Sequence, residues 1–313
     1  MELKQLKYFV SVVEHGSMGK AALALGVVTS ALSQQISRLE SELAIRLLVR
    51  TSGGVVPTEA GLAFCQQAQL TLRHADDAIL AARSARLSGH VSVGLAPSTA
   101  SVIGLPFLKA MQERYPEVRL RLVESLSGHL ESMLIGRQID LAILFRGIPT
   151  QRWSFVPLLD EHLFLIGHAS MKGMPSGSKV ALSKLGGLPL ILPSGSHGLR
   201  ALLDSAFRGS QSHPQIALEV DGLAMLMDAV RGGLGATIQP GAALAHIQNH
   251  SLVSVRIADK DAVRPNLIVS VSDSELSPAG LAARVVLADV SRQLVLAGDW
   301  PGASLRSHNL HKK

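Results

Sequence analysis

The 313-residue sequence contains one cysteine, no long apolar run and no basic segment leading into an apolar one at its start. A single cysteine, Cys65, excludes a disulfide within the chain, so we expect a reducing, cytoplasmic setting. The longest stretch without an ionisable residue, 91–108, is broken by serines, glycines and prolines, which argues against a membrane-spanning helix. The charges of the first residues are spaced along a predicted helix, which is not the pattern of a secretion signal.

The sequence also lacks a concentrated patch of one charge sign. The whole chain has 30 Lys and Arg against 24 Asp and Glu, a formal net charge of +6. Residues 1–60 contain six basic and five acidic side chains, a net charge of +1. Charge alone therefore does not identify a nucleic-acid-binding segment.

Motifs of several enzyme classes are missing or incomplete. His246 and His250 share a predicted helical face, but the segment lacks the glutamate of the H-E-x-x-H zinc motif. The glycines of 232–237 follow a predicted helix and precede a predicted strand, the reverse of the order in a dinucleotide-binding loop. The sequence contains no G-x-S-x-G motif. We therefore expect no enzymatic activity, no metal and no cofactor.

The first 58 residues are predicted to form a small helical domain. Apolar residues at helical spacing predict one helix ending at Gly16, a second from Ser17 to Gly26, and a third capped by Thr29 or Ser30. The three helices share one core. Residues 47–61 suit a short hairpin, and Thr58 is placed to cap a following helix.

That following helix, over 59–87, is predicted to be a linker and dimerisation helix. Small and apolar residues recur along it at alternating spacings of three and four, a seam that favours a partner helix. We expect the partner to be the same helix of a second copy, and docking on this chain's own C-terminal domain is the alternative. The seam residues are Cys65, Ala68, Leu72, Ala75, Ile79 and Ala82.

From residue 91 onward, strand-like and helical segments alternate, which predicts an α/β fold with a mostly parallel sheet. Two strand-like runs lie back to back within 152–167, with only Asp160, Glu161 and His162 between them. This arrangement suits a chain that crosses from one lobe to another. The last residues, 299–313, are expected to be a flexible tail.

The third helix carries a polar face that its fold does not need. Ser30, Ser33, Gln34 and Ser37 form one stripe, about 140° from the apolar stripe of leucines and isoleucine. Short hydroxyls and an amide can hydrogen-bond base edges while the helix enters a major groove. A solvated face is the alternative, although such faces are usually richer in Glu and Lys. We interpret the stripe as a DNA contact.

Residues 6–61 resemble the N-terminal domain of the LysR-type bacterial transcriptional regulators. The residues that match the family pattern are Leu6, Phe9, Ser17, Ala21, Ala22, Ser33, Ile36, Leu39, Glu40, Leu43, Leu47, Arg50, Thr58 and Gly61. The remainder of the chain fits the family's layout at full length. The resemblance implies a winged helix-turn-helix domain over 1–58, the linker helix over 59–87 and a two-lobed α/β effector domain over 91–298.

The resemblance implies residue roles in DNA binding. Thr29, Ser30, Ser33, Gln34 and Ser37 would lie on the recognition helix, and Arg38, Arg50, Thr51 and Thr58 would meet the flanking DNA backbone or minor groove. Gln34 stands where the family often has Arg, so we expect a contact to adenine rather than guanine there. Leu48 stands where the family often has Phe, which affects packing of the wing. The implied partners are promoter DNA, a second copy in a homodimer assembling to a homotetramer, and RNA polymerase, with no membrane.

The implied effector domain resembles type 2 periplasmic binding proteins, with a first lobe of about 91–161 plus 267–298 and a second of about 162–266. A ligand would lie between the lobes at strand ends and helix starts. Plain helix capping is the alternative role for several of its serines and threonines. Hydroxyl groups, His197 and Arg200 favour a small carboxylate or sulfonate, and Phe145 can accommodate an aromatic ring. For Arg200, a surface salt bridge is an equal alternative. The candidate effector contacts are Ser98, Thr99, Ser101, Ser127, Gly128, Phe145, Arg146, Ser194, Ser196, His197 and Arg200.

Two other classes remain open from the sequence. An effector-binding or transport module without DNA function would not need residues 1–87. An enzyme should show a convergent set of acid, base or nucleophile side chains, and we cannot assemble one. We therefore expect a regulator whose DNA binding responds to a small molecule.

Overall fold

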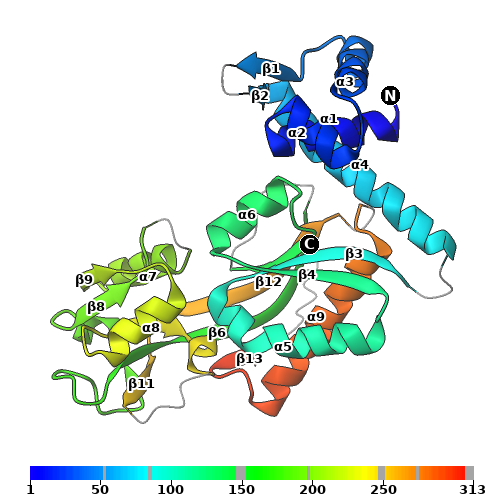
Figure 1. The fold of residues 1–313 in the computed structure, drawn as a ribbon. Coiled ribbons are helices and arrows are strands. Elements are labelled where there is room, and N and C mark those ends of the chain that lie inside the picture. Colours follow the sequence, from blue (N-terminus) through cyan, green and yellow to red (C-terminus); the bar gives the residue numbers. More distant parts are fainter. Residues whose placement is uncertain are drawn as a thin grey trace, which may run out of the picture. The chain divides into compact units, whose positions relative to one another are not determined.

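The computed structural model describes residues 1–51, 54–83, 87–145, 153–195, 198–245, 251–272 and 275–306 (Figure 1). Contacts divide the chain into two compact units, residues 1–90 with 136–138, and residues 91–135 with 139–313. No helix in the described ranges combines the length and the apolar character that crossing a membrane requires.

The first unit is a helical core with a two-stranded hairpin. Its elements are α1 (Leu3–His15), α2 (Met18–Leu25), α3 (Thr29–Leu43), β1 (Leu48–Thr51), β2 (Gly54–Pro57) and α4 (Glu59–Arg83). Gly16 and Gly26 end α1 and α2 in the left-handed conformation, and the Ser17 hydroxyl accepts from the Lys20 amide, as predicted. The predicted cap of α3 is wrong: the extended residue at its start is Val28, so Thr29 and Ser30 already belong to the first turn.

The beginning of α4 belongs to the core of this unit. Cys65 and Ala68 are 7% and 2% exposed and pack with α1 side chains, and Phe64 meets the Phe9 ring edge-on at 5.2 Å. These two residues of the predicted seam are therefore not available to a second copy, which corrects that prediction. Helical spacing predicted correctly that this face of α4 is buried. The helix that buries it is α1 of the same chain.

The rest of the seam lies further along α4. Leu72 is half-buried against the same core, Ala75 is half-buried, and Ile79 is 51% exposed. The side chain of Ala82 is outside the described ones. Only the second half of α4 is thus available for a contact between two copies of the chain.

The second unit consists of two lobes connected by long strands. In the order of the chain its elements begin with β3 (Gly89–Leu95), α5 (Pro97–Arg114), β4 (Val118–Glu124), α6 (Ser127–Ile135), β5 (Leu141–Leu144), β6 (Trp153–His168), β7 (Lys179–Val180), η1 (Leu182–Lys184) and β8 (Pro189–Leu192). They continue with α7 (Gly198–Gly209), β9 (Gln215–Glu219), α8 (Leu223–Arg231), β10 (Thr237–Pro240), η2 (Gly241–Leu244), β11 (Leu252–Ile257), β12 (Val263–Val271), α9 (Pro278–Ala297) and β13 (Ala303–Leu305).

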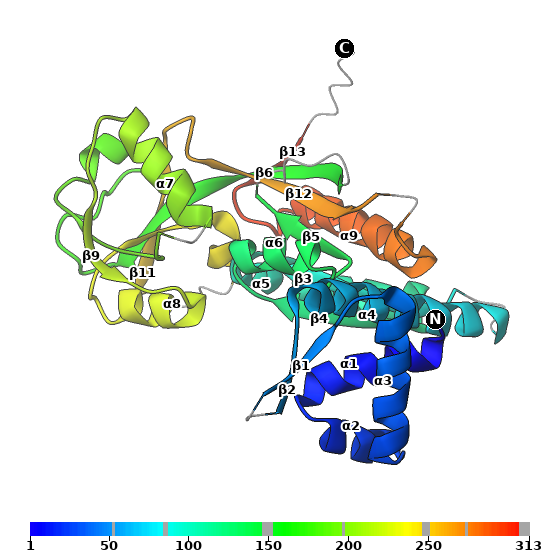
Figure 2. The ribbon, with the colours of Figure 1, turned by 90° about the horizontal axis from the view of Figure 1, so that it is seen from above.

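The main sheet has the order β4-β3-β5-β12-β6-β11-β7, and β10 and β13 also pair with β6. The expectation of a mostly parallel sheet is wrong. The pairs β3–β5, β7–β11 and β8–β9 are parallel, but β12 is antiparallel to β5 and β6, and β6 is antiparallel to β10, β11 and β13. The reason is that β6 and β12 both run between the lobes, in opposite directions (Figure 2).

Each lobe has its own apolar core. The first lobe packs α5 and α9 against β3 and β5, around Ile103, Phe107 and Leu287. The second packs α7 and α8 against β8, β10 and the far half of β6, with Leu203 and Phe207 fully buried or nearly so. The predicted crossing is confirmed, because β6 is one continuous strand of 16 residues that contains Asp160, Glu161 and His162.

The C-terminal end is ordered as far as it is described, which corrects the expected flexible tail. Trp300 is 2% exposed, and β13 pairs with β6. Residues 307–313 lie outside the described ranges. The physical reason is that a short polar segment can be held in place by partners that are far away in the sequence.

Candidate nucleic-acid interface and interlobe cleft

Helix α3 turns its polar stripe away from the core of the first unit. Leu32, Ile36 and Leu39 are between 0% and 2% exposed. On the other side of the helix, Thr29, Ser30, Gln34, Ser37 and Arg38 are exposed and Ser33 is half-buried. A contact of these groups with DNA stays a prediction, but their side chains are placed where a base edge could meet them.

The hairpin that follows α3 is fastened to it by one carboxylate. Glu40 accepts hydrogen bonds from the backbone amides of Leu47 and Leu48, at 2.7 and 3.0 Å. From the hairpin, Arg50 donates to the Ser33 hydroxyl at 3.3 Å. Helix α3 and the hairpin are thereby held in one geometry. In the sequence, Glu40 is only a match to the family pattern, and this role was not predicted.

Thr58 acts as a cap. Its hydroxyl donates to the Arg46 carbonyl at 2.9 Å and accepts from the Gly61 amide at 2.9 Å, at the start of α4. The hydroxyl is therefore engaged within the protein, which confirms the predicted capping role, and a DNA contact of Thr58 stays a prediction. A Cβ on Gly61 would lie 2.0 Å from the Leu47 carbonyl oxygen, so glycine is required there.

The other two predicted backbone contacts are exposed, with partners on the protein. Arg38 lies 3.4 Å from the Glu42 carboxylate, and the Thr51 hydroxyl donates to the Gly54 carbonyl at 3.3 Å. The N-terminal ammonium of Met1 hydrogen-bonds Glu42 and lowers the pKa of that carboxyl group. A DNA phosphate would compete with Glu42 for Arg38.

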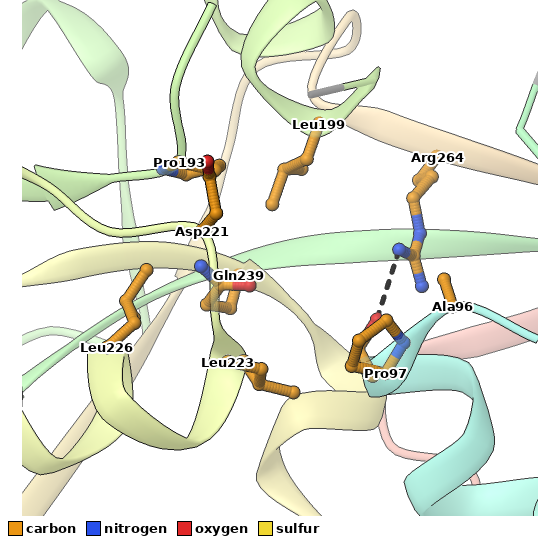
Figure 3. Close-up of a pocket in the computed structure, with 10 residues that line it drawn as sticks. Ala96, Pro97, Pro193, Leu199, Asp221, Leu223, Leu226, Gln239 and Arg264 are labelled. Atoms are coloured by element: carbon orange, nitrogen blue, oxygen red, sulfur yellow. Dashed lines mark hydrogen bonds between the residues drawn. The ribbon is translucent and has the colours of Figure 1, made fainter. Parts of the chain in front are cut away.

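Two cavities lie between the lobes of the second unit. The smaller has a volume of about 20 Å³, room for about one water molecule, and is lined by Ser98, Asp221, Gln239, Arg264 and apolar side chains (Figure 3). The larger, of about 370 Å³, is lined by Ser127, Gly128, Glu131, Phe145 and Leu202 among others. Leu199 and Arg264 line both cavities. The volume of the larger cavity falls in the range of small-molecule sites, whereas the smaller one has room for no more than the end group of a ligand.

Helix starts surround this cleft. At α5 and α8, the residues that precede the first turn are Ala96 and Gly222, and no described side chain caps either helix. Helices α6 and α7 begin at Ser127 and Gly198, which line the larger cavity. The amides of a first helical turn carry partial positive charge and favour an anion.

Arg264 is the buried cation of the cleft. Its side chain is 3% exposed and pairs with the fully buried Glu161 through Nε at 3.1 Å and Nη2 at 2.6 Å. Nη1 donates to the Ser98 hydroxyl at 3.2 Å, and the guanidinium lies 3.8 Å from the centroid of the Phe145 ring. Burial lowers the pKa of Arg264, and the charge of Glu161 opposes that effect.

Several predicted effector residues line the cleft. Ser98 belongs to the smaller cavity, and Ser127, Gly128 and Phe145 to the larger one. Thr99 is fully buried, with its hydroxyl 3.5 Å from Arg264. Their role in binding stays a prediction.

Other predicted contacts are differently engaged. Ser101 donates back to the Ser98 carbonyl at 2.7 Å, within its own helix. Ser194 donates to Asp221 at 3.1 Å. Arg200 pairs with Glu219 at 2.7 Å and Asp204 at 2.9 Å, and the hydrogen bond that it donates to Glu219 raises the pKa of Arg200. Arg200 thus belongs to a salt-bridge network of the second lobe, and its contact with a ligand stays a prediction. Arg146, Ser196 and His197 lie outside the described residues.

Sequence reasoning missed Glu161, Arg264, Asp221 and Gln239. A signal for the first two was present, since each charged residue interrupts a strand that is otherwise largely apolar. It did not reveal that the two strands pair, with Glu161 opposite Arg264. In the part of the chain that the structure describes, no cluster of three or more His, Cys, Asp or Glu side chains is arranged to hold a metal ion.

Comparison with known proteins identifies both units. Residues 3–62 match the family model described as bacterial regulatory helix-turn-helix protein, lysR family, and residues 84–292 match the LysR substrate binding domain. The chain is 37% identical over 246 residues to the nitrogen assimilation regulatory protein nac of Klebsiella aerogenes, covering 78% of this chain and 79% of that protein.

Solved structures show the same fold. A full-length OxyR variant from Pseudomonas aeruginosa superposes with a TM-score of 0.71 at 21% identity, covering 93% of this chain and 98% of that one. An OxyR mutant of Corynebacterium glutamicum with bound H2O2 gives 0.61 at 26% identity, covering 95% and 96%. The chain therefore belongs to the LysR family of DNA-binding transcriptional regulators, with a helix-turn-helix segment followed by an effector-binding domain.

Proposed function

We propose that this regulator binds promoter DNA through the polar face of α3 and changes that binding when a small organic anion occupies the cleft between its lobes. The observation that carries the proposal is the exposed stripe of Ser30, Gln34 and Ser37 over a buried apolar stripe. On this proposal Ser33 reads base edges with them, and Arg38, Arg50 and Thr51 meet the flanking DNA backbone.

The DNA part is tested with the full chain and a pool of random duplexes. Sequences enriched by the unmodified protein are footprinted with it and with Ser33→Glu, which places a carboxylate against the DNA. We expect Ser33→Glu to lose the specific footprint while it keeps its fold and oligomeric state. Gln66→Glu, an equally acidic change on an exposed residue of α4, should keep the footprint. A footprint retained by Ser33→Glu would reject the role of α3.

The anion is supported by the electrostatics of the smaller cavity. The uncapped starts of α5 and α8 and the Arg264 guanidinium border this space, and the Asp221 carboxylate, which also lines it, accepts hydrogen bonds from the amide and hydroxyl of Ser194. Phe145 and Leu202 line the adjoining cavity, which suits an apolar or aromatic body. We infer a carboxylate or sulfonate whose charged end lies near Ser98 and Arg264. The pairing of Arg264 with Glu161 means that the helix starts supply much of the attraction.

Benzoate, benzenesulfonate and the uncharged benzamide test this chemistry. A ligand that binds the folded state raises the melting temperature. We expect the two anions to raise it in a concentration-dependent way, with a much smaller effect of benzamide. Equal effects of the anions and benzamide would contradict an anionic effector.

Thiol oxidation is the second effector chemistry to consider, because one solved relative is described as H2O2-bound. The sequence makes this chemistry unsuitable for the cleft. Its one cysteine is Cys65, which precedes the effector-binding domain, is buried in the core of the first unit, and has a pKa raised by that burial. A buried thiol with a raised pKa is a poor nucleophile toward peroxide.

The response is proposed to travel from the lobes to paired DNA-binding domains. A ligand that binds one arrangement of the lobes better than another shifts their equilibrium, and the linker helix transmits the preference. We propose domain limits of 1–58, 59–87 and 91–298, a homodimer assembling to a homotetramer, and action in the cytoplasm as a regulator rather than an enzyme. RNA polymerase is the further partner expected at a promoter.

A further inference from the structure

The segment after α9 lies beyond the part of the chain that matches the family's substrate-binding domain. That match ends at residue 292. Beyond it, β13 pairs with β6 at Leu159, Asp160 and Glu161. On the opposite edge of β6 the same three residues pair with β12, at Asn266, Pro265 and Arg264. The C-terminal segment therefore adds a third strand at the point where the chain crosses between the lobes.

The fit of this segment is close. A Cβ on Gly241 would lie 1.8 Å from the Pro301 carbonyl oxygen, and a Cβ on Gly302 would lie 2.5 Å from the Phe164 ring. Gly302 also has a φ of +69°, in the left-handed region that favours glycine. Glycines at both contacts allow the backbone of residues 299–305 to lie directly against β6 and η2.

Trp300 connects the segment to the charged centre of the cleft. Its indole Nε1 donates to Glu161 Oε1 at 3.1 Å, and the Ala242 amide donates to the same oxygen at 2.7 Å. The other oxygen, Oε2, accepts from Arg264 and, at 3.4 Å, from Asn266. One oxygen of the Glu161 carboxylate thus binds the C-terminal segment, and the other oxygen binds the cleft arginine.

We propose that residues 299–305 act as a strap and that Trp300 is a positioning residue, which holds Glu161 and through it fixes Arg264 in the effector cleft. The inference rests on the proposed anionic effector. It adds that the response to the anion depends on a segment outside the matched domain. Without the indole N–H, Glu161 Oε1 loses one of its two donors, so the carboxylate and the paired guanidinium can change position.

The test uses Trp300→Phe, which keeps most of the buried ring and removes the N–H. Trp153→Phe is the matched control, because Trp153 is the other tryptophan and is half-buried at the start of β6. Binding of sodium benzoate and of benzamide is measured by calorimetry on full chains. We expect Trp300→Phe to weaken the binding of benzoate about five-fold, the scale of one typical hydrogen bond, and to leave the binding of benzamide unchanged. Trp153→Phe should change neither.

If Trp300→Phe lost equal affinity for benzoate and benzamide, Trp300 would have a structural role only and the proposal would be overturned. Unchanged affinity of Trp300→Phe for benzoate would overturn it too. No benzoate binding to any variant would overturn both the anionic effector and the strap. Normal benzoate binding in unmodified protein and in Trp300→Phe would overturn the strap alone.

A second measurement does not depend on the folding of Trp300→Phe. In Trp153→Phe the only tryptophan is Trp300, so its emission reports on the group next to Glu161. Saturating benzoate should shift this emission, and benzamide should not. Emission that is unaffected by benzoate would overturn the proposal.

Discussion

The two candidate sites are built in opposite ways. On α3 the polar groups are exposed, and what fixes them lies behind: the buried leucines, the Glu40 carboxylate and the Thr58 cap. In the cleft the charged groups are themselves part of the core, with Glu161 0% and Arg264 2% exposed. Changing an exposed group of α3 should alter DNA binding with little effect on stability, whereas changing Glu161 or Arg264 should alter both.

The largest effect is expected for Glu161→Gln, which leaves a buried guanidinium without its counter-charge. Breaking one side of a buried ion pair costs about 3–5 kcal/mol of unfolding free energy. Urea unfolding followed by tryptophan fluorescence measures this, because Trp153 and Trp300 both belong to the second unit. Glu124→Gln, on an exposed residue, should stay within about 0.5 kcal/mol. A cost below about 1 kcal/mol for Glu161→Gln would remove the contrast between the sites.

Gly61→Ala should have the next largest effect, in the first unit. The added Cβ would meet the Leu47 carbonyl, so the start of α4 or the hairpin must move, at a cost of about 3 kcal/mol. Gly19→Ala in α2 is the control, since its nearest neighbour is the Ser17 hydroxyl at 3.9 Å. That change should stabilise the helix by about 0.5–1 kcal/mol. Thermal melting followed by circular dichroism compares the stability of the two variants, and footprinting compares their DNA binding. Equal melting temperatures would contradict the close approach of Gly61 to the Leu47 carbonyl.

Thr58→Ala should have a smaller effect, about 1 kcal/mol, because it removes one helix cap. Thr58→Ser keeps the hydroxyl and should recover most of the loss. Hydrogen exchange at the Gly61 amide reports the change locally. Exchange and stability that are unaltered in Thr58→Ala, together with weakened DNA binding, would contradict the capping role and favour the direct DNA contact.

The features that the sequence predicted correctly depend on short segments of chain. Gly16, Ser17 and Gly26 act on the helix beside them, and the two stripes of α3 follow from 3.6 residues per turn. The crossing strand β6 was also predictable, because its two apolar runs adjoin in the sequence. In each case the residues that decide the structure are near neighbours.

The features that were missed depend on partners far apart in the chain. Arg264 and Trp300 lie 103 and 139 positions from Glu161, and only the pairing of β6 with β12 and β13 brings them together. Periodicity showed that Cys65 and Ala68 face something apolar, but not that α1 fills that role. For Arg200, residue type suggested a ligand contact, while folding placed two carboxylates within reach.

The most direct test of the account is whether α3 reads base edges. Gln34 is exposed on its polar face, and an amide pairs best with adenine in the major groove. DNA sequences selected by the unmodified protein and by Gln34→Ala should differ at one base pair of each half-site, where the preference for adenine is lost, with the remaining preferences intact. If Gln34→Ala bound DNA with the same base preferences and the same affinity as the unmodified chain, that result would contradict the account.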